Sequence, residues 1–287
     1  MDFRRRKIKI HAFATWLLGS LAIIVLFIDI AIFVTSNIVA NDAKNGVENM
    51  ECDFCERLIA ELKAEAEEAV RKAEEERIAN AKGVIYLTFD DGPGADTARL
   101  LDILKAKDVK ATFFVTGVGD DALIKREYDE GHTVGLHSFT HRYNVIYTSV
   151  AAYFDDLNQV ATRVKNITGE DAKLIRFPGG SSNTVSARYD GGARIMSTLV
   201  NEVQNRGYQY FDWNISSGDA GGANTADEVF VNVAAHLKEG PNVVLQHDIK
   251  SYSVDAVERI IDHGLSNGYI FMPLTTSSPV THHNVNN

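Results

Sequence analysis

Two adjacent carboxylates stand at the start of the part of the sequence that could do chemistry. Asp90 and Asp91 lie in residues 88–93 (TFDDGP), directly after the apolar run 84–87 (VIYL). That run is short and rich in β-branched and aromatic residues, which predicts a buried strand, and the Gly-Pro pair predicts its end. Two carboxylates at such a junction repel each other unless a cation or a proton lies between them. The pair is therefore a candidate metal or acid–base site, and a solvated Asp-Asp-Gly turn is the ordinary alternative.

Polar side chains also follow four other apolar runs. They are found in residues 137–141 (HSFTH), 176–180 (RFPGG), 212–219 (DWNISSGD) and 247–248 (HD). His137 and His141, four residues apart, form a His-His-Asp set if a carboxylate from another strand end joins them, and three protein ligands leave one position open, as catalytic zinc requires. Metal-assisted hydrolysis further needs a base, an acid and an oxyanion donor. The second carboxylate of the Asp-Asp pair could be the base and His247 the acid, with Arg176 or Asp219 to orient them.

The elements that must position these groups alternate between strand and helix from Gly83 onward. The strand candidates are 84–88, 111–115, 133–137, 174–177, 208–213, 243–246 and 270–273, and the helix candidates are 95–107, 120–130, 149–167, 193–205, 226–238 and 253–267. Strands separated by helices predict parallel βαβ units, hence an α/β barrel slightly short of the eightfold form or an open doubly wound sheet. Functional groups gather at the carboxyl ends of the strands in either architecture, so these polar strand ends predict one catalytic rim.

The N-terminal part differs from the rest of this acidic chain, whose formal net charge of −10 argues against a nucleic-acid partner. Residues 1–12 carry five Lys or Arg residues against Asp2 alone, and residues 13–40 are almost uncharged, broken only by Asp29. The apolar stretch is long enough to cross a bilayer of about 30 Å, and its basic flank predicts a cytoplasmic N-terminus. We expect an uncleaved single-pass anchor that places the rest of the chain outside the cell. A cleaved signal peptide is the alternative.

Residues 41–82 are predicted to form a helical stalk, because residues 50–82 lack Gly and Pro and are dense in Ala, Glu, Lys and Arg. Positions Cys52, Cys55, Ile59, Leu62, Ala66, Ala69 and Ala73 recur at the spacings of three and four that are typical of a coiled coil. The seam is mostly alanine, so we expect either a weak homodimer or a solvated spacer helix. The two cysteines, the only ones in the chain, favour a disulfide within or between chains, or packing alone, over redox catalysis.

Five motifs in residues 83–275 resemble those of the polysaccharide deacetylases (carbohydrate esterase family four), which include peptidoglycan, chitin and xylan deacetylases. The motifs are residues 88–93, 137–141, 176–180, 212–219 and 245–248, and they occur in the order of that family. The resemblance covers nearly all of residues 83–275, but neither the anchor nor the stalk. It implies a distorted (β/α)7-type barrel.

The resemblance also implies roles for the polar residues of the rim. Asp91, His137 and His141 would bind a divalent metal, most often Zn²⁺. Asp90 would be the general base that takes a proton from the attacking water, and Arg176 would hold it in place. His247 would protonate the leaving amine, with Asp219 hydrogen-bonded to it.

The remaining assignments from the resemblance concern the substrate. The backbone N–H of Gly179 would stabilise the oxyanion, and Leu245 would line the pocket for the acetyl methyl group. Many members have Tyr where Gly179 stands, and Trp where Ala220 follows the fourth motif. One wall of the acetyl pocket would therefore be missing here, or supplied by Trp213 or Phe211.

These features predict a metal-dependent deacetylase at the cell surface, acting on N-acetylated glycans, with peptidoglycan N-acetylglucosamine as the leading substrate. Chitin oligomers, an exopolysaccharide and acetylated xylan are alternative substrates. A non-catalytic glycan-binding protein that retains the metal site and a redox protein using the two cysteines are alternative classes. Outside the rim, we expect Asp248 to be structural, and residues 276–287, which include His282 and His283, to be a disordered polar tail.

Overall fold

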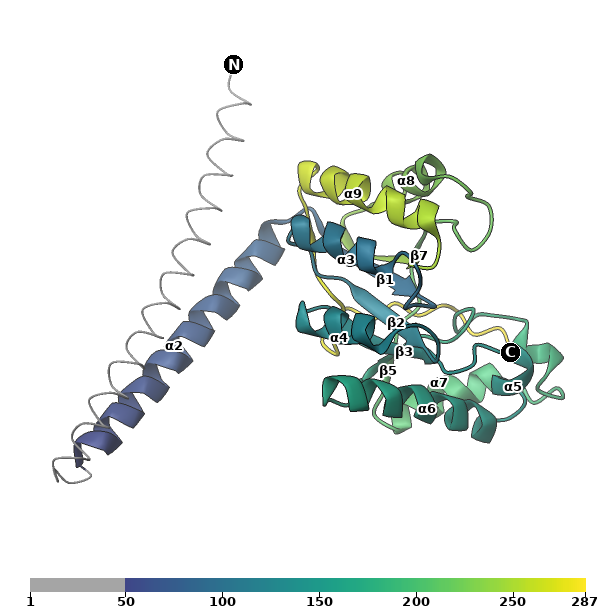
Figure 1. Ribbon diagram of the computed structural model, residues 1–287, viewed down its shortest axis with the longest axis horizontal. Helices are drawn as coiled ribbons and strands as arrows, with labels where there is room; N and C mark the ends of the chain where they lie inside the picture. The colour runs from purple at the N-terminus through teal and green to yellow at the C-terminus, as the bar shows by residue number, and fades with distance from the viewer. Residues whose placement is uncertain (1–49) are drawn as a thin grey trace, which may run out of the picture. The chain divides into compact units, whose positions relative to one another are not determined.

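The computed structural model describes residues 50–287. These fall into two units, residues 50–80 and residues 81–287, each considered by itself. In the first unit, α2 (Met50–Asn80) is one continuous helix within the predicted stalk, residues 41–82 (Figure 1). Arg71 pairs with Glu68 and Glu75 one turn away on either side, a spacing that supports an exposed helix. The predicted anchor, residues 13–40, lies outside the described residues. Within residues 50–287, no helix is both long and apolar enough to cross a membrane.

The second unit contains an eight-stranded sheet in which every recorded pair of strands is parallel. The strands are β1 (Gly83–Asp90), β2 (Thr112–Thr116), β3 (Thr133–Ser138), β4 (Leu174–Ile175), β5 (Gln209–Tyr210), β6 (Ile215–Ser216), β7 (Gly240–His247) and β8 (Tyr269–Phe271). Their order is β5-β4-β3-β2-β1-β7-β6, and β8 pairs with β1. The first part of β1 pairs with β8 and its last part with β2, so both lie along one edge of β1, and β7 lies along the other.

The predicted α/β class with parallel strands is confirmed, but the sheet differs from a seven-stranded barrel. It forms a half-barrel, with β5 and β6 at the two ends of the strand order. The sequence analysis missed β6, because a two-residue strand offers no apolar run long enough to recognise. The candidate strand 208–213 is likewise shorter in the structure, where β5 covers two residues.

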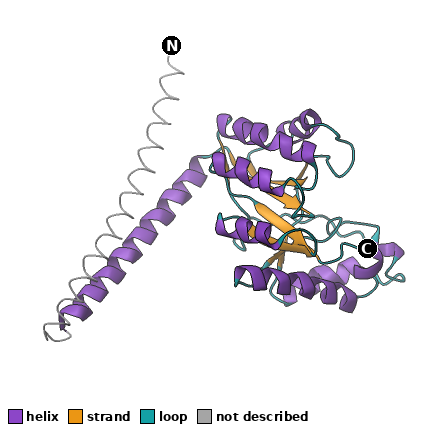
Figure 2. Cartoon of the chain, in the orientation of Figure 1, coloured by secondary structure: helices purple, strands orange, loops and turns teal. Residues whose placement is uncertain are grey.

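Helices surround the sheet, as the alternating pattern predicts (Figure 2). They are α3 (Thr97–Ala106), α4 (Asp121–Asp129), α5 (Tyr143–Ile146), α6 (Val150–Thr168), the 3₁₀ turn η1 (Ser186–Arg188), α7 (Ile195–Asn205), α8 (Ala226–Ala234) and α9 (Ser251–Ser266). Side-chain caps fix several starts: Ser149 accepts from the N–H of Ala152, and Thr225 with Glu228 forms a capping box. α5 and η1 were not predicted, because elements of one turn leave no periodic pattern.

The alternation along β1 explains how the sheet leads to the site. Ile85, Leu87 and Phe89 belong to the large core shared with the helices. Val84 and Tyr86 belong to a second apolar cluster, formed with residues of β2, β4 and β7. Successive strand residues point to opposite faces, so Thr88 and Asp90 continue the face of Val84 and Tyr86. That face is apolar at the amino end of β1 and polar at its carboxyl end.

Candidate active site and metal centre

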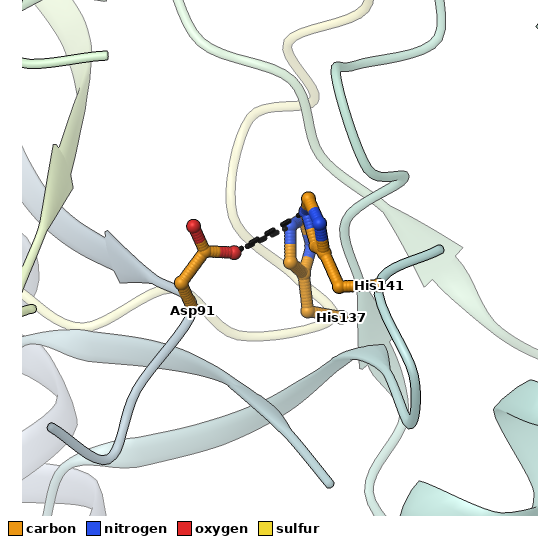
Figure 3. A group of neighbouring side chains, drawn as sticks. All are labelled: Asp91, His137 and His141. Carbon is orange, nitrogen blue, oxygen red and sulfur yellow. Dashed lines mark ion pairs between the residues drawn. The ribbon is translucent and has the colours of Figure 1, made fainter. Parts of the chain in front are cut away.

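The carboxylate of Asp91 and two imidazoles converge on one point (Figure 3). Nε2 of His137 lies 3.4 Å, and Nε2 of His141 3.3 Å, from the same Oδ1 atom of Asp91. That oxygen is buried, and within residues 56–287 it has no hydrogen-bond partner. A buried carboxylate oxygen without a donor, facing two imidazole nitrogens, is satisfied by a cation. The donor set therefore fits a divalent metal, with ligands of the types that zinc prefers.

The orientation of His137 fits a ligand role. Its Nδ1 donates a hydrogen bond of 2.8 Å to the backbone oxygen of Arg176, which leaves the lone pair of Nε2 directed at the metal centre. Burial lowers the pKa of His137, and this favours the neutral imidazole that metals bind. Asp91 (φ 75°) and His141 (φ 52°) both adopt left-handed backbone conformations. Such strain in non-glycine residues is found preferentially at functional sites.

Asp156 in α6 holds the turn that carries His141. Its carboxylate accepts hydrogen bonds from the backbone N–H groups of Phe139 and Thr140 and from the hydroxyls of Ser138 and Thr140. The N–H of His141 in turn donates to the hydroxyl of Ser138. The sequence analysis missed this positioning residue, because a carboxylate in the middle of a helix gives no signal of the loop it contacts.

A buried ion pair fixes the predicted base. Oδ1 of Asp90 accepts a 2.9 Å hydrogen bond from Nη1 of Arg176, which is fully buried. Three further N–H groups of the guanidinium donate to the hydroxyl of Thr88 and to the backbone oxygens of Phe211 and Asp212. Arginine can hold several acceptors in one rigid plane, so this network fixes the direction of the Asp90 carboxylate.

His247 at the end of β7 lies across the centre from His137. Its Nδ1 donates a 2.9 Å hydrogen bond to Asp219, and its Nε2 lies 3.9 Å from Oδ2 of Asp91. Burial lowers the pKa of His247, but the hydrogen bond to Asp219 and the charges of the nearby aspartates outweigh burial and raise it to about 9. For Asp219, burial opposes ionisation, and the hydrogen bonds from His247 and Ser253 outweigh it and lower the pKa. The raised pKa favours the protonated imidazole at neutral pH, the form that a general acid requires.

The turn after β4 requires glycine at two positions. Gly179 and Gly180 both have φ 78°. A Cβ atom at position 179 would lie 2.6 Å from the hydroxyl oxygen of Tyr143, and one at position 180 would lie 2.9 Å from the ring of Trp213. Tyr143 in α5 was missed by the sequence analysis, although its place two residues after His141 was a signal. Burial and the charges of nearby carboxylates raise the pKa of its hydroxyl.

The two predicted pocket residues lie in the same region of the half-barrel. Leu245 is buried and pairs in register with Thr88 of β1 and Ser216 of β6. It stands two residues before His247 on β7, hence on the same face of that strand. Trp213 is half-buried, with its ring against Gly180.

The C-terminal segment, residues 281–287, contradicts the prediction of a disordered tail. The ring of His282 stacks on Tyr210 of β5, with centroids 3.7 Å apart. The N–H of His283 donates to the Asp212 carboxylate, and its Nε2 donates to the backbone oxygen of Trp213. Polar groups of this segment form hydrogen bonds with residues that follow β5. The sequence alone does not show that these two parts of the chain lie side by side.

Two further buried carboxyls lie outside the rim. Asp248 accepts a hydrogen bond from Thr97, and burial raises its pKa to about 7. Glu127 in α4 is fully buried, and neither of its carboxyl oxygens has a hydrogen-bond partner within residues 56–287. Burial raises its pKa well above the ordinary value. The contact of Asp248 with Thr97, at the start of α3, is consistent with the structural role expected for it.

The fold and this rim are those of a polysaccharide deacetylase, and comparison with known proteins shows the same class. The polysaccharide deacetylase family model matches residues 77–193. A peptidoglycan-N-acetylglucosamine deacetylase of Bacillus cereus is 37% identical over 200 residues, covering 66% of this chain and 68% of its own length. The putative polysaccharide deacetylase YheN of Bacillus subtilis is 33% identical over 195 residues, and the match covers 65% of each protein.

Solved structures give the same result. The catalytic domain of a peptidoglycan N-acetylglucosamine deacetylase from Eubacterium rectale is 54% identical, with a TM-score of 0.68, and the match covers 71% of this chain and 94% of that one. The polysaccharide deacetylase Bc1974 from Bacillus cereus is 36% identical, with a TM-score of 0.61, covering 69% and 96%. The chain therefore belongs to the polysaccharide deacetylase family, carbohydrate esterase family four, a family of hydrolases that act on carbon–nitrogen bonds.

Proposed function

We propose that this protein removes N-acetyl groups from an extracellular polysaccharide, with peptidoglycan N-acetylglucosamine as the substrate and Zn²⁺ as the metal. One observation carries the proposal: a carboxylate held by a buried arginine and an imidazole held by a buried carboxylate lie on either side of the Asp91 centre. A base and an acid placed in this way are needed for hydrolysis and have no use in mere glycan binding. The names of the Bacillus cereus and Eubacterium rectale relatives support the choice of substrate.

Asp91, His137 and His141 are the residues that would hold the metal. A divalent cation there would lower the pKa of a water molecule and stabilise negative charge that develops on the acetyl oxygen. The carboxylate of Asp90 accepts the proton of the attacking water, and Arg176 keeps that carboxylate in place. Because Asp90 is almost fully buried, little solvent competes for the same proton.

His247 acts after the attack. Its protonated Nε2 donates a proton to the amine nitrogen of the sugar as the carbon–nitrogen bond breaks and acetate is released. Asp219 fixes the ring through Nδ1 and stabilises its charged form. The N–H of Gly179 is the proposed donor to the oxyanion, and Leu245 the proposed wall for the acetyl methyl group. None of these residues forms a covalent bond to the substrate.

We further propose that residues 13–40 anchor the protein in the cell membrane, with residues 1–12 in the cytoplasm and residues 83–275 outside. The basic start and the uncharged stretch after it support this topology. A cell-wall glycan would then be within reach of the rim. A weak homodimer through α2 is proposed with it, since Leu62 of the predicted seam is exposed on that helix.

The test is acetate release by the purified, Zn²⁺-loaded full chain, compared on peptidoglycan, chitin oligomers and acetylated xylan. We expect acetate and new free amines from peptidoglycan, and loss of both on chelation, with recovery when Zn²⁺ is restored. Faster release from chitin oligomers or xylan would transfer the substrate assignment to that glycan. Glycan binding without acetate release from any of the three would contradict the enzymatic proposal and favour a non-catalytic binding protein.

A further inference from the structure

We propose that Tyr143 is a further catalytic residue, whose hydroxyl donates a hydrogen bond to the acetyl oxygen of the substrate as that oxygen becomes negatively charged. The inference deepens the proposed deacetylation and rests on it. The ring of Tyr143 packs against His141 and Tyr147, and its hydroxyl lies beside Gly179.

The ring of Tyr143 is fixed between a metal-ligand candidate and an anchored neighbour. One side packs edge-on against the imidazole of His141, with centroids 5.7 Å apart and planes at 80°. The other side packs against Tyr147 at 5.5 Å. Tyr147 is itself fully buried, and its hydroxyl donates a 2.8 Å hydrogen bond to the backbone oxygen of Pro178. A ring held on both sides loses little conformational freedom when substrate binds.

The hydroxyl of Tyr143 lies against the turn that carries the proposed oxyanion donor. A Cβ atom built on Gly179 would be only 2.6 Å from that hydroxyl oxygen. The glycine therefore leaves space that the end of the phenol fills, and the phenol O–H lies beside the residue whose N–H is the proposed oxyanion donor. His141 places the metal centre next to the same ring.

This hydroxyl differs from two other tyrosine hydroxyls near the site in having no protein acceptor. Tyr147 donates to Pro178, and Tyr252 donates to the backbone oxygen of Asp219. For Tyr143, which is half-buried, the structure records no hydrogen bond of the hydroxyl to any residue in the described part of the chain. Buried tyrosine hydroxyls usually find a hydrogen-bond partner, so a partly buried, fixed phenol with a free donor beside a metal-ligand candidate is suited to a ligand.

The chemistry follows from this position. Water attacks the carbonyl carbon, Asp90 takes its proton, and the carbonyl electron pair moves onto the acetyl oxygen. A tyrosine hydroxyl carries its proton at neutral pH, so Tyr143 donates a hydrogen bond without transferring that proton. When the intermediate collapses, the electron pair returns, and the amine leaves with a proton from His247. The hydrogen bond is strongest while the oxygen is charged, so it stabilises the transition state more than the substrate.

The test compares Tyr143→Phe with Tyr208→Phe in the Zn²⁺-loaded full chain. Phenylalanine keeps the ring contacts with His141 and Tyr147, so the variant is expected to keep its melting temperature and metal content. Removing one oxyanion donor typically costs about 10²-fold or more in kcat. We expect a loss of about that size in kcat on an N-acetylglucosamine oligosaccharide, with KM within about twofold, because the interaction belongs to the transition state. Tyr208 is half-buried just before β5, at the amino ends of the strands, and its loss should leave kcat unchanged.

A second measurement uses a methylphosphonamidate analogue of the N-acetyl group, whose tetrahedral oxygens resemble the intermediate. Calorimetric titration should show that Tyr143→Phe weakens the analogue by about the same factor as it lowers kcat/KM. A raised KM with unchanged kcat, or unchanged affinity for the analogue, would overturn the role of Tyr143 while leaving the deacetylase proposal intact. A wild-type chain that releases no acetate would instead overturn the proposed function, and the role of Tyr143 with it.

Discussion

Two buried histidines at the two ends of β3 show how a polar residue of the catalytic rim differs from one of the scaffold. His132 precedes β3 and His137 lies near its end. Nδ1 of His132 accepts a 3.1 Å hydrogen bond from the N–H of Ala111, and its buried Nε2 has no partner within residues 56–287. Nδ1 of His137 instead donates to a carbonyl, and its Nε2 faces Asp91. The same side chain is structural at one end of the strand and a ligand candidate at the other.

Charge distribution accounts for the difference. Burial lowers the pKa of both histidines, that of His132 to about 4. For His132, the charges of Lys110 and Arg126 add to the effect of burial and only Glu130 opposes it. For His137, both Asp90 and Asp91 partly offset the effect of burial. Polar groups of the rim therefore face one another at a candidate metal centre, while burial favours the neutral forms of His132 and Glu127 in the scaffold. Four predictions test this contrast.

The largest effect is expected for His137→Ala. Loss of a ligand should abolish stoichiometric Zn²⁺ binding and lower kcat/KM by about 10³-fold or more, because the charge stabilisation supplied by a metal is worth several kcal/mol. Zinc analysis and acetate release measure the two effects. His132→Phe is the matched variant at the other end of the strand and should keep both. Equal losses in the two variants would remove the distinction between rim and scaffold.

Asp90→Asn should come next. Without a base, kcat is expected to fall by about 10²- to 10⁴-fold, the usual range for general acid–base catalysis. The metal content should stay at the wild-type level, because Asp91, not Asp90, faces the two imidazoles at ligand distance. Wild-type turnover by Asp90→Asn would show that another group takes the proton.

The pH dependence tests the acid. His247 must be protonated to act, and its pKa is raised to about 9, so activity should persist at neutral pH and fall as pH rises through about 9. Asp219→Asn removes the main group that raises this pKa, so the alkaline limit should move down toward the ordinary value near 6.5. The pH–rate profiles of the two proteins give the comparison. An unmoved alkaline limit would assign it to a different group.

The smallest effect concerns the scaffold. The folded-state pKa of Glu127 is raised well above 4.5, so the folded protein holds a proton there that the unfolded chain loses. Stability should therefore decline as pH rises above about 4.5, and Glu127→Gln should raise the free energy of unfolding at pH 8 by roughly 1–3 kcal/mol. Denaturant unfolding at pH 5 and pH 8 measures this, and kcat should not change. A variant less stable at pH 8 would show that the carboxylate has a charged role.

Much of this protein could be predicted from local sequence. The apolar runs at 84–88 and 243–246 are long enough to identify buried strands, and the residues after them are candidate site residues because parallel strands share one carboxyl edge. For that reason the predicted groups Asp90, Asp91 and His247 lie at one rim in the structure. Spacing within a segment, as between His137 and His141, is likewise a local property of the chain.

Other features were decided only by tertiary structure, because they depend on contacts between segments with no common pattern. Asp156 reaches the turn that carries His141 from a helix, and Tyr143 fills the space left by Gly179. The polar segment 281–287 docks because β5 ends where its hydrogen-bonding groups can be satisfied, and β5 and β6 stand at the two ends of the strand order. A strand can be predicted from a run of neighbouring residues. These contacts join positions far apart along the chain, and only folding brings them together.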